Sequence, residues 1–197
     1  MVIWTGVKVE SMAIGIVEYC EKWKRGFEDE RELMVTTFRS QIKAIEHIGS
    51  TSIPGQSAKP IIDIFIAVSP FRKVSFYDRK LFALSYRKTP TDIAGRHLFA
   101  RYTRENTWTH NLHILPWDVE FYSRNEILFR DYLRKRPDMV ARYNDLKKLL
   151  VLRSFSSLDE YTKAKTQFIQ EVVDLARIEK GLPRQNVWTM EYIKEDK

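Results

Sequence analysis

The sequence predicts an α+β domain, in which a small mixed β-sheet flanked by helices is followed by a C-terminal helical segment. Three features predict this class. A helical pattern opens the chain, short apolar runs separated by turn residues fill its middle, and three helical patterns follow in its second half. One helix, a small sheet with a crossing helix, and a helical tail together form the element order of an α+β fold.

The first predicted element is an amphipathic helix from about Glu21 to Gln41. Phe27, Met34 and Phe38 recur there at roughly helical spacing, with charged residues between them. A short strand over Lys43–Ile48 is predicted to follow, and it runs into a turn rich in glycine and serine. Proline and glycine residues after this turn exclude a helix there.

A buried strand is predicted over Ile61–Val68, which is apolar and rich in β-branched residues. Because side chains alternate along a strand, Asp63, Phe65 and Ala67 share one face. The sheet region is completed by three further predicted elements: a helix near Val74–Leu84 and strands at about His97–Tyr102 and Thr107–Leu115.

Three helices are predicted in the second half of the chain: Glu126–Leu133, Pro137–Leu152 and Leu158–Ile178. Pro137 suits the first position of a helix. Ser157 and Glu160 form a capping box before the last helix, and Gly181 with Pro183 ends it.

The 197 residues are enough for one domain with a hydrophobic core, and 44% hydrophobic residues exclude a disordered chain. We expect this domain over residues 1–182, with the sheet core at about 43–120 and the helical part at about 121–180. Residues 183–197 are expected to form a loose extension. The formal net charge of +7 favours anionic partners such as nucleotides, polyphosphates or nucleic acid.

The composition also bears on location and on metal chemistry. The single cysteine, Cys20, excludes a disulfide framework and a thiolate metal cluster. No signal peptide is evident, and no apolar run approaches the ~20 residues of a membrane span. We therefore expect a cytoplasmic protein without a membrane partner.

The stretch Ile45–Val68, IEHIGSTSIPGQSAKPIIDIFIAV, places a Gly-Ser turn shortly before an aspartate within an apolar run. Four turn residues can offer backbone N–H groups or hydroxyls to phosphate oxygens: Gly49, Ser50, Thr51 and Ser52. An ionised Asp63 is costly in a core unless it is paired, hydrogen-bonded or bound to a cation. The alternative is a plain turn beside a strand whose aspartate pairs with Lys59 or an arginine. Because turn and acid occur together, we favour a phosphate site beside a metal-binding carboxylate.

Several motifs resemble those of the GrpB family and occur in the family's order. EHIGSTSIPGQSAKPIIDI resembles the family signature, and VEYCEKWKRGFEDERELM resembles its opening segment. THNLHIL is similar to the family's H-x-L-H strand, and FRDYLRKRPDMVARYNDLKKLL to its following helices. Tyr161, Lys165 and Phe168 fit the closing Y…K…F pattern. The resemblance implies a fold of the nucleotidyltransferase superfamily, with a polymerase-β-like core.

This resemblance implies specific roles for residues of the turn and the following strand. Gly49 and Ser50 would contact nucleotide phosphates, and Asp63 would be the first Mg²⁺ ligand. A nucleotidyl group would then pass to a hydroxyl or an amine. In such chemistry two metal ions ~3.5–4 Å apart stabilise the entering and the leaving oxygens.

The acidic set expected from the superfamily is incomplete. Phe65 stands where a second acid would share the strand face with Asp63, and the strand Thr107–Leu115 carries no carboxylate. Asp118 and Glu120, just beyond that strand, are the remaining candidates for a third acid. One or two carboxylates with substrate phosphates can still hold Mg²⁺. The sequence is therefore compatible with a Mg²⁺-nucleotide complex but conflicts with full two-metal catalysis.

Further candidates surround this turn and strand. His47 or His113 could bind metal, act as a general base or donate to a phosphate, or could be structural. We assign His113 a catalytic role together with Asp63. Lys59, fixed in direction by the following proline, either holds phosphate or neutralises Asp63.

Cationic and aromatic residues at helical spacing are candidates for the wall of an anion pocket. Arg130 and Arg134 are four residues apart and therefore lie on one helical face. The same spacing recurs in two later pairs: Tyr143 with Lys147, and Tyr161 with Lys165. The alternative is a set of solvated helices with local ion pairs, such as Asp131 with Arg134.

The leading hypothesis is a nucleotidyltransferase-like protein that binds a nucleotide or other phosphorylated small molecule in a basic cleft, and transfers a nucleotidyl group with Mg²⁺ if it is an enzyme. A non-catalytic binding module on the same fold is the second hypothesis. RNA binding, which would show a steep salt dependence, comes last because no aromatic stacking motif is evident. No nucleophile elbow and no Walker motif occur in the sequence.

Overall fold

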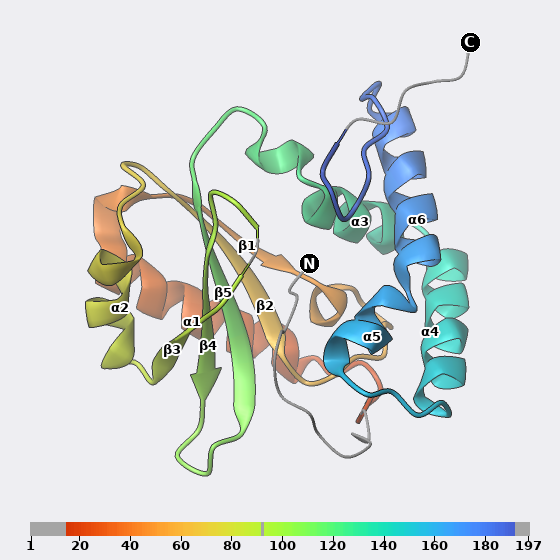
Figure 1. Cartoon of the computed structure of the whole chain (residues 1–197), viewed down its shortest axis with the longest axis horizontal. Helices are drawn as coiled ribbons and strands as arrows, with labels where there is room; N and C mark the ends of the chain where they lie inside the picture. Colours follow the sequence, from red (N-terminus) through yellow and green to blue (C-terminus); the bar gives the residue numbers. More distant parts are fainter. Residues whose placement is uncertain (1–14, 92, 192–197) are drawn as a thin grey trace.

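The computed structural model describes residues 15–91 and 93–191, whose arrangement is drawn in Figure 1. A five-stranded sheet has the order β1-β2-β5-β4-β3. Its strands are β1 (Ile42–Ile48), β2 (Ile62–Val68), β3 (Tyr86–Thr89), β4 (His97–Tyr102) and β5 (Trp108–Pro116). Strands β2 and β5 are parallel and the other neighbours are antiparallel. The predicted α+β class with a mixed sheet is therefore confirmed.

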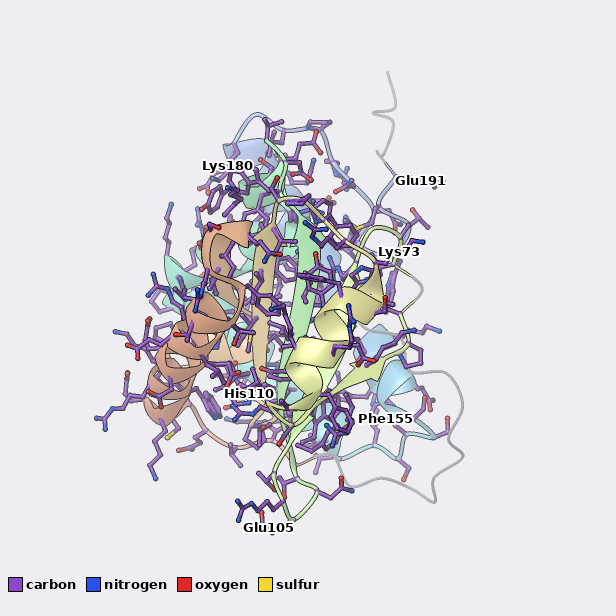
Figure 2. All side chains as sticks on the ribbon, turned by 90° about the vertical axis from the view of Figure 1, so that its left-hand side faces the viewer. Lys73, Glu105, His110, Phe155, Lys180 and Glu191 are labelled. Carbon is purple, nitrogen blue, oxygen red and sulfur yellow. The ribbon has the colours of Figure 1, made fainter. Side chains whose placement is uncertain are left out.

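One face of the sheet is covered by α1 (Lys22–Phe38) and α2 (Val74–Phe82), which lie in front of it in Figure 2. Ile62, Ile64 and Ile66 of β2 point to this side, where they join the largest hydrophobic cluster with residues of both helices. The predicted first helix ends at Phe38, and a single 3₁₀ turn continues it to Gln41.

The opposite face of β2 carries Asp63, Phe65 and Ala67, as the strand alternation predicts. Phe65 and Ala67 pack against a second cluster that includes Phe121 and Ile127. The remaining helices lie on this side of the sheet in Figure 1: α3 (Asn125–Arg134), α4 (Pro137–Val151), α5 (Leu158–Lys163) and α6 (Thr166–Glu179). Asp63 is thus placed between the sheet and the helical half of the molecule.

The helix predicted over Leu158–Ile178 is instead two helices, because α5 ends at Lys163 and α6 begins at Thr166. Neither glycine nor proline stands at the break, so the hydrophobic pattern gave no sign of it. The Ser157 hydroxyl accepts a bond from the backbone N–H of Glu160, which confirms half of the capping box. The Glu160 carboxylate accepts from the backbone N–H of Ser156 instead of Ser157.

Strand β3 was not predicted, since four residues with exposed Arg87 and Lys88 at the centre give almost no alternation. The segment after Gly181 also differs from the expected loose extension as far as residue 191. Val187 is buried in a cluster of α3, α4 and α6 residues, and the Trp188 indole donates to Thr166 Oγ1 at 2.8 Å. Residues 192–197 of the extension lie outside the described residues.

Among the helices formed by the described residues, none is long and apolar enough to cross a membrane.

Candidate functional site

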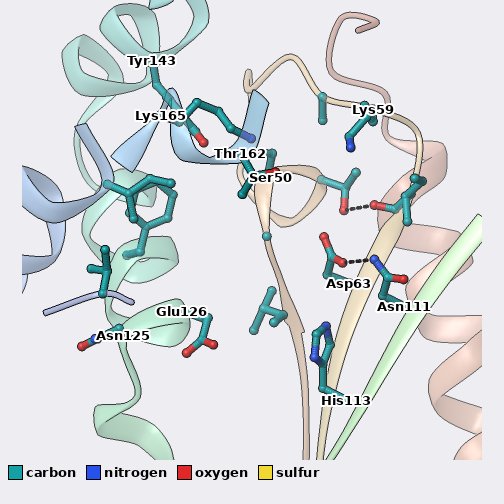
Figure 3. Close-up of a pocket in the computed structure, with 18 of the residues that line it drawn as sticks. Ser50, Lys59, Asp63, Asn111, His113, Asn125, Glu126, Tyr143, Thr162 and Lys165 are labelled. Carbon is teal, nitrogen blue, oxygen red and sulfur yellow. Dashed lines mark hydrogen bonds between the residues drawn. The ribbon is translucent and has the colours of Figure 1, made fainter. Parts of the chain in front are cut away.

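A cavity of about 260 Å³ lies where the Asp63 face of the sheet meets the helical half, and Figure 3 shows its interior. Its walls come from the turn after β1, from β2 and β5, from the helices α3 to α6, and from the segment after α6. Nine of the predicted site residues line it: Gly49, Ser50, Thr51, Lys59, Asp63, His113, Lys147, Tyr161 and Lys165. The structure therefore gathers into one cavity residues from both halves of the sequence.

The turn that follows β1 lies directly against the Asp63 carboxylate. Ile48, the last residue of β1, pairs with Asp63 across the sheet, so the next residue sits over the aspartate. Gly49 has φ +70° and ψ −176°, a backbone conformation that is essentially restricted to glycine. A Cβ atom at this position would lie 2.4 Å from Asp63 Oδ2. Glycine is therefore required both by the backbone conformation and by the closeness of the carboxylate.

Among the described side chains, an amide holds Asp63 by a hydrogen bond. Asn111, its neighbour on the parallel strand β5, donates from Nδ2 to Asp63 Oδ1 at 2.7 Å (Figure 3). Burial raises the pKa of Asp63, while the Asn111 hydrogen bond and the charges of Lys59 and Lys165 lower it. The carboxylate thus lines the cavity within reach of the turn, as the phosphate-site interpretation requires.

Two of the turn hydroxyls that were predicted to donate to phosphate are used inside the protein. Thr51 Oγ1 donates to the carbonyl of Ile61 and accepts from His47 Nε2 at 3.0 Å. Ser52 Oγ donates to the carbonyl of Gly49 at 2.6 Å. These hydroxyls hold the shape of the turn, so in this structure their protons are donated within the protein and not towards the cavity.

Three lysine side chains reach the cavity from three different elements. Lys59 comes from the loop before β2, Lys147 from α4, and Lys165 from the junction of α5 and α6. Figure 3 shows the Lys59 and Lys165 side chains pointing toward one another above Asp63. Lys147 Nζ donates to Ser50 Oγ at 2.8 Å and to the carbonyl of Ser57 at 2.6 Å, which fixes the turn from behind.

Burial makes these ammonium groups easier to deprotonate. Burial and, to a smaller extent, the charge of Lys59 lower the pKa of Lys165 to about 7, while the charge of Asp63 opposes the shift. Burial also lowers the pKa of Lys59 and, strongly, that of Lys147. The cavity therefore concentrates positive charge that water solvates poorly, and an anion would stabilise it.

Aromatic rings support the same lysines. The ammonium of Lys165 lies 4.1 Å from the centre of the Tyr161 ring, and that of Lys147 lies 4.1 Å from the Tyr143 ring. The pairs with four-residue spacing in the sequence are therefore cation–π pairs that direct both lysines into the cavity. Burial raises the pKa of Tyr161 to about 12, so its hydroxyl stays protonated.

The side chains around Asp63 do not fit the expected magnesium site. No group of three or more His, Cys, Asp or Glu side chains within residues 15–91 and 93–191 is arranged to hold a metal ion. Next to Asp63 stand an amide, Asn111, and the ammonium groups of Lys59 and Lys165. Asp118, one candidate for a further acid, is paired with Arg124 at 2.5 Å. Magnesium prefers several oxygen ligands, whereas this donor set supplies one carboxylate among cations.

Arg130 and Arg134 were predicted to line the anion pocket, and the structure places them outside it. Arg130 donates to Glu46, to Asp131 and to the carbonyl of His47. Arg134 donates twice to the carbonyl of Ser52, at 2.8 and 3.0 Å. Both arginines of α3 therefore hold β1 and the Gly-Ser turn in position by hydrogen bonds within the protein.

The substitution Arg130→Met is expected to lower the free energy of unfolding by about 3 kcal/mol, because it leaves the Glu46 carboxylate without its buried partner. The control is Arg142→Met, since the Arg142–Glu171 pair is exposed and its loss should cost less than ~1 kcal/mol. Urea unfolding at pH 7 measures both. Equal losses for the two variants would contradict the positioning role of Arg130.

The two histidines considered from the sequence differ in place. His47 faces α1, where its ring stacks on Phe27 with 4.8 Å between ring centres, so it is structural. His113 lines the cavity, and its Nδ1 atom is buried without a hydrogen-bond partner among the described residues. Burial lowers the pKa of His113 well below its usual value, and the Arg96 charge adds to this, so the ring is neutral.

Two charged residues of the cavity were missed by the sequence reasoning. Arg96 precedes β4, and Glu126 lies in the first turn of α3; they pair at 2.8 Å between Arg96 Nη2 and Glu126 Oε1. Figure 3 shows Glu126 and His113 on the side of Asp63 away from the lysines. No spacing in the sequence connects residues 30 positions apart, so only the folded arrangement of α3 and the sheet reveals this pair.

Comparisons with known proteins agree with this architecture. A family model described as "GrpB protein" matches residues 13–175. The "Glutamate-rich protein GrpB" of Alkalihalophilus pseudofirmus is 36% identical over 163 residues, which are 81% of this chain and 93% of that protein. The "UPF0157 protein YqkA" of Bacillus subtilis is 38% identical over 165 residues, and this chain spans about half of its length (47%).

A solved structure has the same fold. The crystal structure of the conserved protein GrpB from Enterococcus faecalis is similar with a TM-score of 0.76 and 29% sequence identity, over 85% of this chain and 99% of that one. The arrangement of sheet and helices described above is therefore shared with an experimental structure.

Proposed function

The chain belongs to the GrpB family, and from this premise we propose that its cavity binds a phosphorylated small molecule, with the phosphate between Lys59 and Lys165 and against the Gly49 turn. One observation carries the proposal. Two ammonium groups from distant parts of the chain point toward one another above a single carboxylate (Figure 3). The resemblance to the nucleotidyltransferase superfamily makes a nucleotide the favoured member of this ligand class.

The charges of the cavity support an anionic ligand. Lys59 and Lys165 act on Asp63, Lys147 lines the same cavity from the Ser50 side of the turn, and burial lowers the pKa of all three lysines. Such lowered pKa values mean that the described side chains compensate the charges of the ammonium forms poorly. A phosphate dianion would compensate them through charge-assisted hydrogen bonds.

The size of the cavity supports a small ligand. Its volume of about 260 Å³ lies just below the range of roughly 300–1,000 Å³ for sites of drug-sized molecules. A mononucleotide or a sugar phosphate is closer to this size than a strand of RNA. RNA binding is therefore the weaker alternative, and it would require micromolar affinity that fades between low and physiological salt.

Binding is proposed to be independent of Mg²⁺, because lysines occupy the positions from which a metal would neutralise the phosphate. Nucleotidyl transfer stays a prediction of the superfamily resemblance alone, and a non-catalytic binding module fits the donor set better. Release of pyrophosphate from nucleoside triphosphates with Mg²⁺ and a panel of small acceptors would favour the enzyme instead.

Thermal unfolding tests the proposed function. Inorganic phosphate, ribose 5-phosphate, UMP and GMP are added in EDTA, and uridine and guanosine serve as unphosphorylated controls. A ligand at 100 times its Kd stabilises by about 2.7 kcal/mol, which raises Tm by roughly 5–10 °C for a chain of this size. We expect shifts with phosphorylated compounds and none with the nucleosides. No shift with any phosphorylated compound would overturn the proposal.

The substitution Asp63→Asn separates this proposal from a metal site. Asparagine can accept the same bond from Asn111, and it removes the negative charge that stands below the phosphate position. We expect phosphate affinity in EDTA, measured at a pH below the pKa of Lys165, to be retained or to rise several-fold, because like-charge repulsion is removed while Lys165 stays protonated. Isothermal titration calorimetry measures it, with Asp78→Asn on α2 as the control. Loss of binding in the Asp63 variant would assign the carboxylate a direct part in holding the ligand.

A further inference from the structure

Arg96 is a buried cation whose donors are only partly used. Its side chain is 2% exposed, and its Nη2 atom donates to Glu126. The Nε and Nη1 atoms are buried without a hydrogen-bond partner among residues 15–91 and 93–191, although Arg96 lines the cavity. Roughly 90% or more of buried polar groups are hydrogen-bonded, so two unpartnered donors on one buried guanidinium point to a missing partner.

The surroundings of Arg96 hold its guanidinium in place. Its central carbon lies 4.8 Å from the centre of the Phe65 ring, and the neutral ring of His113 packs edge-on against the same phenylalanine. Phe65 thus stands where the superfamily would place an acid and instead supports an arginine.

The net charge at the end of the cavity that holds Arg96 and Glu126 differs from the net charge at the end that holds the lysines. Burial alone would raise the pKa of Glu126, but the Arg96 charge holds it below the usual range, so the carboxylate is ionised. Arg96 and Glu126 therefore compensate one another as a pair. A second anion would be repelled by Glu126, whereas a neutral group with both an acceptor and a donor would suit the pair.

Apolar side chains of the helical half form part of the cavity wall. Phe129, Val173 and Val187 line it and belong to the hydrophobic cluster of that half, and Ile169, which also lines it, packs against this cluster. The Glu126 side chain keeps 21% of its surface exposed, and Figure 3 shows it pointing into the cavity from α3. This combination of apolar wall and paired polar groups is typical of sites for neutral heterocycles and amides.

We propose that Arg96 and Glu126 form a second subsite that binds a neutral carbonyl adjacent to an N–H, as on an oxopurine or pyrimidinedione ring, in the same ligand whose phosphate lies at the lysines. The carbonyl accepts from the unpartnered donors of Arg96, and the N–H donates to Glu126. The inference rests on the proposed phosphate site and deepens it. The ligand would then carry two recognised groups: a phosphate at the lysine end of the cavity, and a neutral carbonyl beside an N–H at the end with Arg96 and Glu126.

Calorimetric titration of the wild-type chain with ribose 5-phosphate, UMP and GMP tests the subsite without any substitution. Ribose 5-phosphate supplies only the phosphate end, whereas both nucleotides carry a carbonyl beside an N–H. We expect at least one nucleotide to bind about tenfold or more tightly than ribose 5-phosphate, the effect of one hydrogen bond to a charged group. If ribose 5-phosphate binds and neither nucleotide binds more tightly, the subsite is excluded while the phosphate site stands. If none of the three binds, both proposals fail.

The variant Arg96→Lys then tests whether Arg96 causes the tighter binding of the nucleotide. Lysine keeps the charge opposite Glu126 but removes the planar set of donors. We expect it to weaken binding of the preferred nucleotide about tenfold and to change ribose 5-phosphate affinity by less than about twofold. The control is Arg101→Lys, because Arg101 pairs with Glu30 of α1 on the other face of the sheet. Equal weakening of nucleotide and ribose 5-phosphate by Arg96→Lys, or no weakening of either, would exclude the subsite.

Discussion

The substitution Gly49→Ala is expected to lower the free energy of unfolding by about 4 kcal/mol, the sum of two independent penalties. The backbone of Gly49 has φ +70° and ψ −176°, a region in which a side chain costs about 1–3 kcal/mol. The new Cβ would also lie 2.4 Å from Asp63 Oδ2. Relieving that overlap requires a shift of the turn or of β2, which costs roughly 1–3 kcal/mol in a packed protein.

A matched control separates these two penalties. Gly181 also has a positive φ, +65°, but a Cβ added there meets no atom of the described residues within 4 Å. Gly181→Ala should therefore lower the free energy of unfolding only by the penalty for the backbone conformation, about 1 kcal/mol. Urea unfolding gives both values, and the double variant Gly49→Ala/Asp63→Ala should recover part of the loss. Equal losses of unfolding free energy for the two substitutions would show that overlap with the Asp63 carboxylate does not contribute to the cost at Gly49.

Much of the fold follows from residues that are close in the sequence. The alternation in β2 correctly predicts that Asp63 and Phe65 share a face, because successive side chains of a strand point to opposite faces of the sheet. The spacing in α1 is equally informative, since Trp23, Phe27 and Met34 are buried against the sheet. Local patterns do not predict a helix boundary that is set by tertiary packing. The break between α5 and α6 is such a boundary, because neither glycine nor proline marks it.

The candidate site is less predictable, because it combines residues from the sheet, from the helices of the second half and from the loops between them. The Gly49 turn and Asp63 could be predicted, since a Gly-Ser turn shortly before an acid within an apolar run is visible in the sequence itself. Arg130 was assigned wrongly because helical spacing gives the face of a residue but not the acid that meets it. Arg96 and Glu126 could not be predicted at all, since each becomes informative only next to the other.

The substitution Lys165→Gln is expected to weaken phosphate binding by about 10- to 100-fold at pH 7, the effect of losing a charge-assisted hydrogen bond. Its control is Lys148→Gln on α4, which removes the same charge from a side chain that is 72% exposed. Because burial of the ammonium is unfavourable, replacing it with a neutral amide should not lower Tm in the absence of ligand. A loss of binding without a loss of stability is therefore the expected pattern for the Lys165 variant.

The pH dependence gives a second and independent measurement of Lys165. Burial and the charge of Lys59 lower its pKa to about 7, while the charge of Asp63 opposes the shift. Binding of phosphate favours the protonated amine, so affinity should fall as the pH rises from about 7 towards about 9. Phosphate esters lose their second proton near pH ~6, so the ligand charge is nearly constant over this interval. Lys165→Arg should bind without this decline, because guanidinium stays protonated. An unchanged decline in the Lys165→Arg variant would assign the titration to another lysine of the cavity, Lys59 or Lys147, and remove Lys165 from the phosphate site.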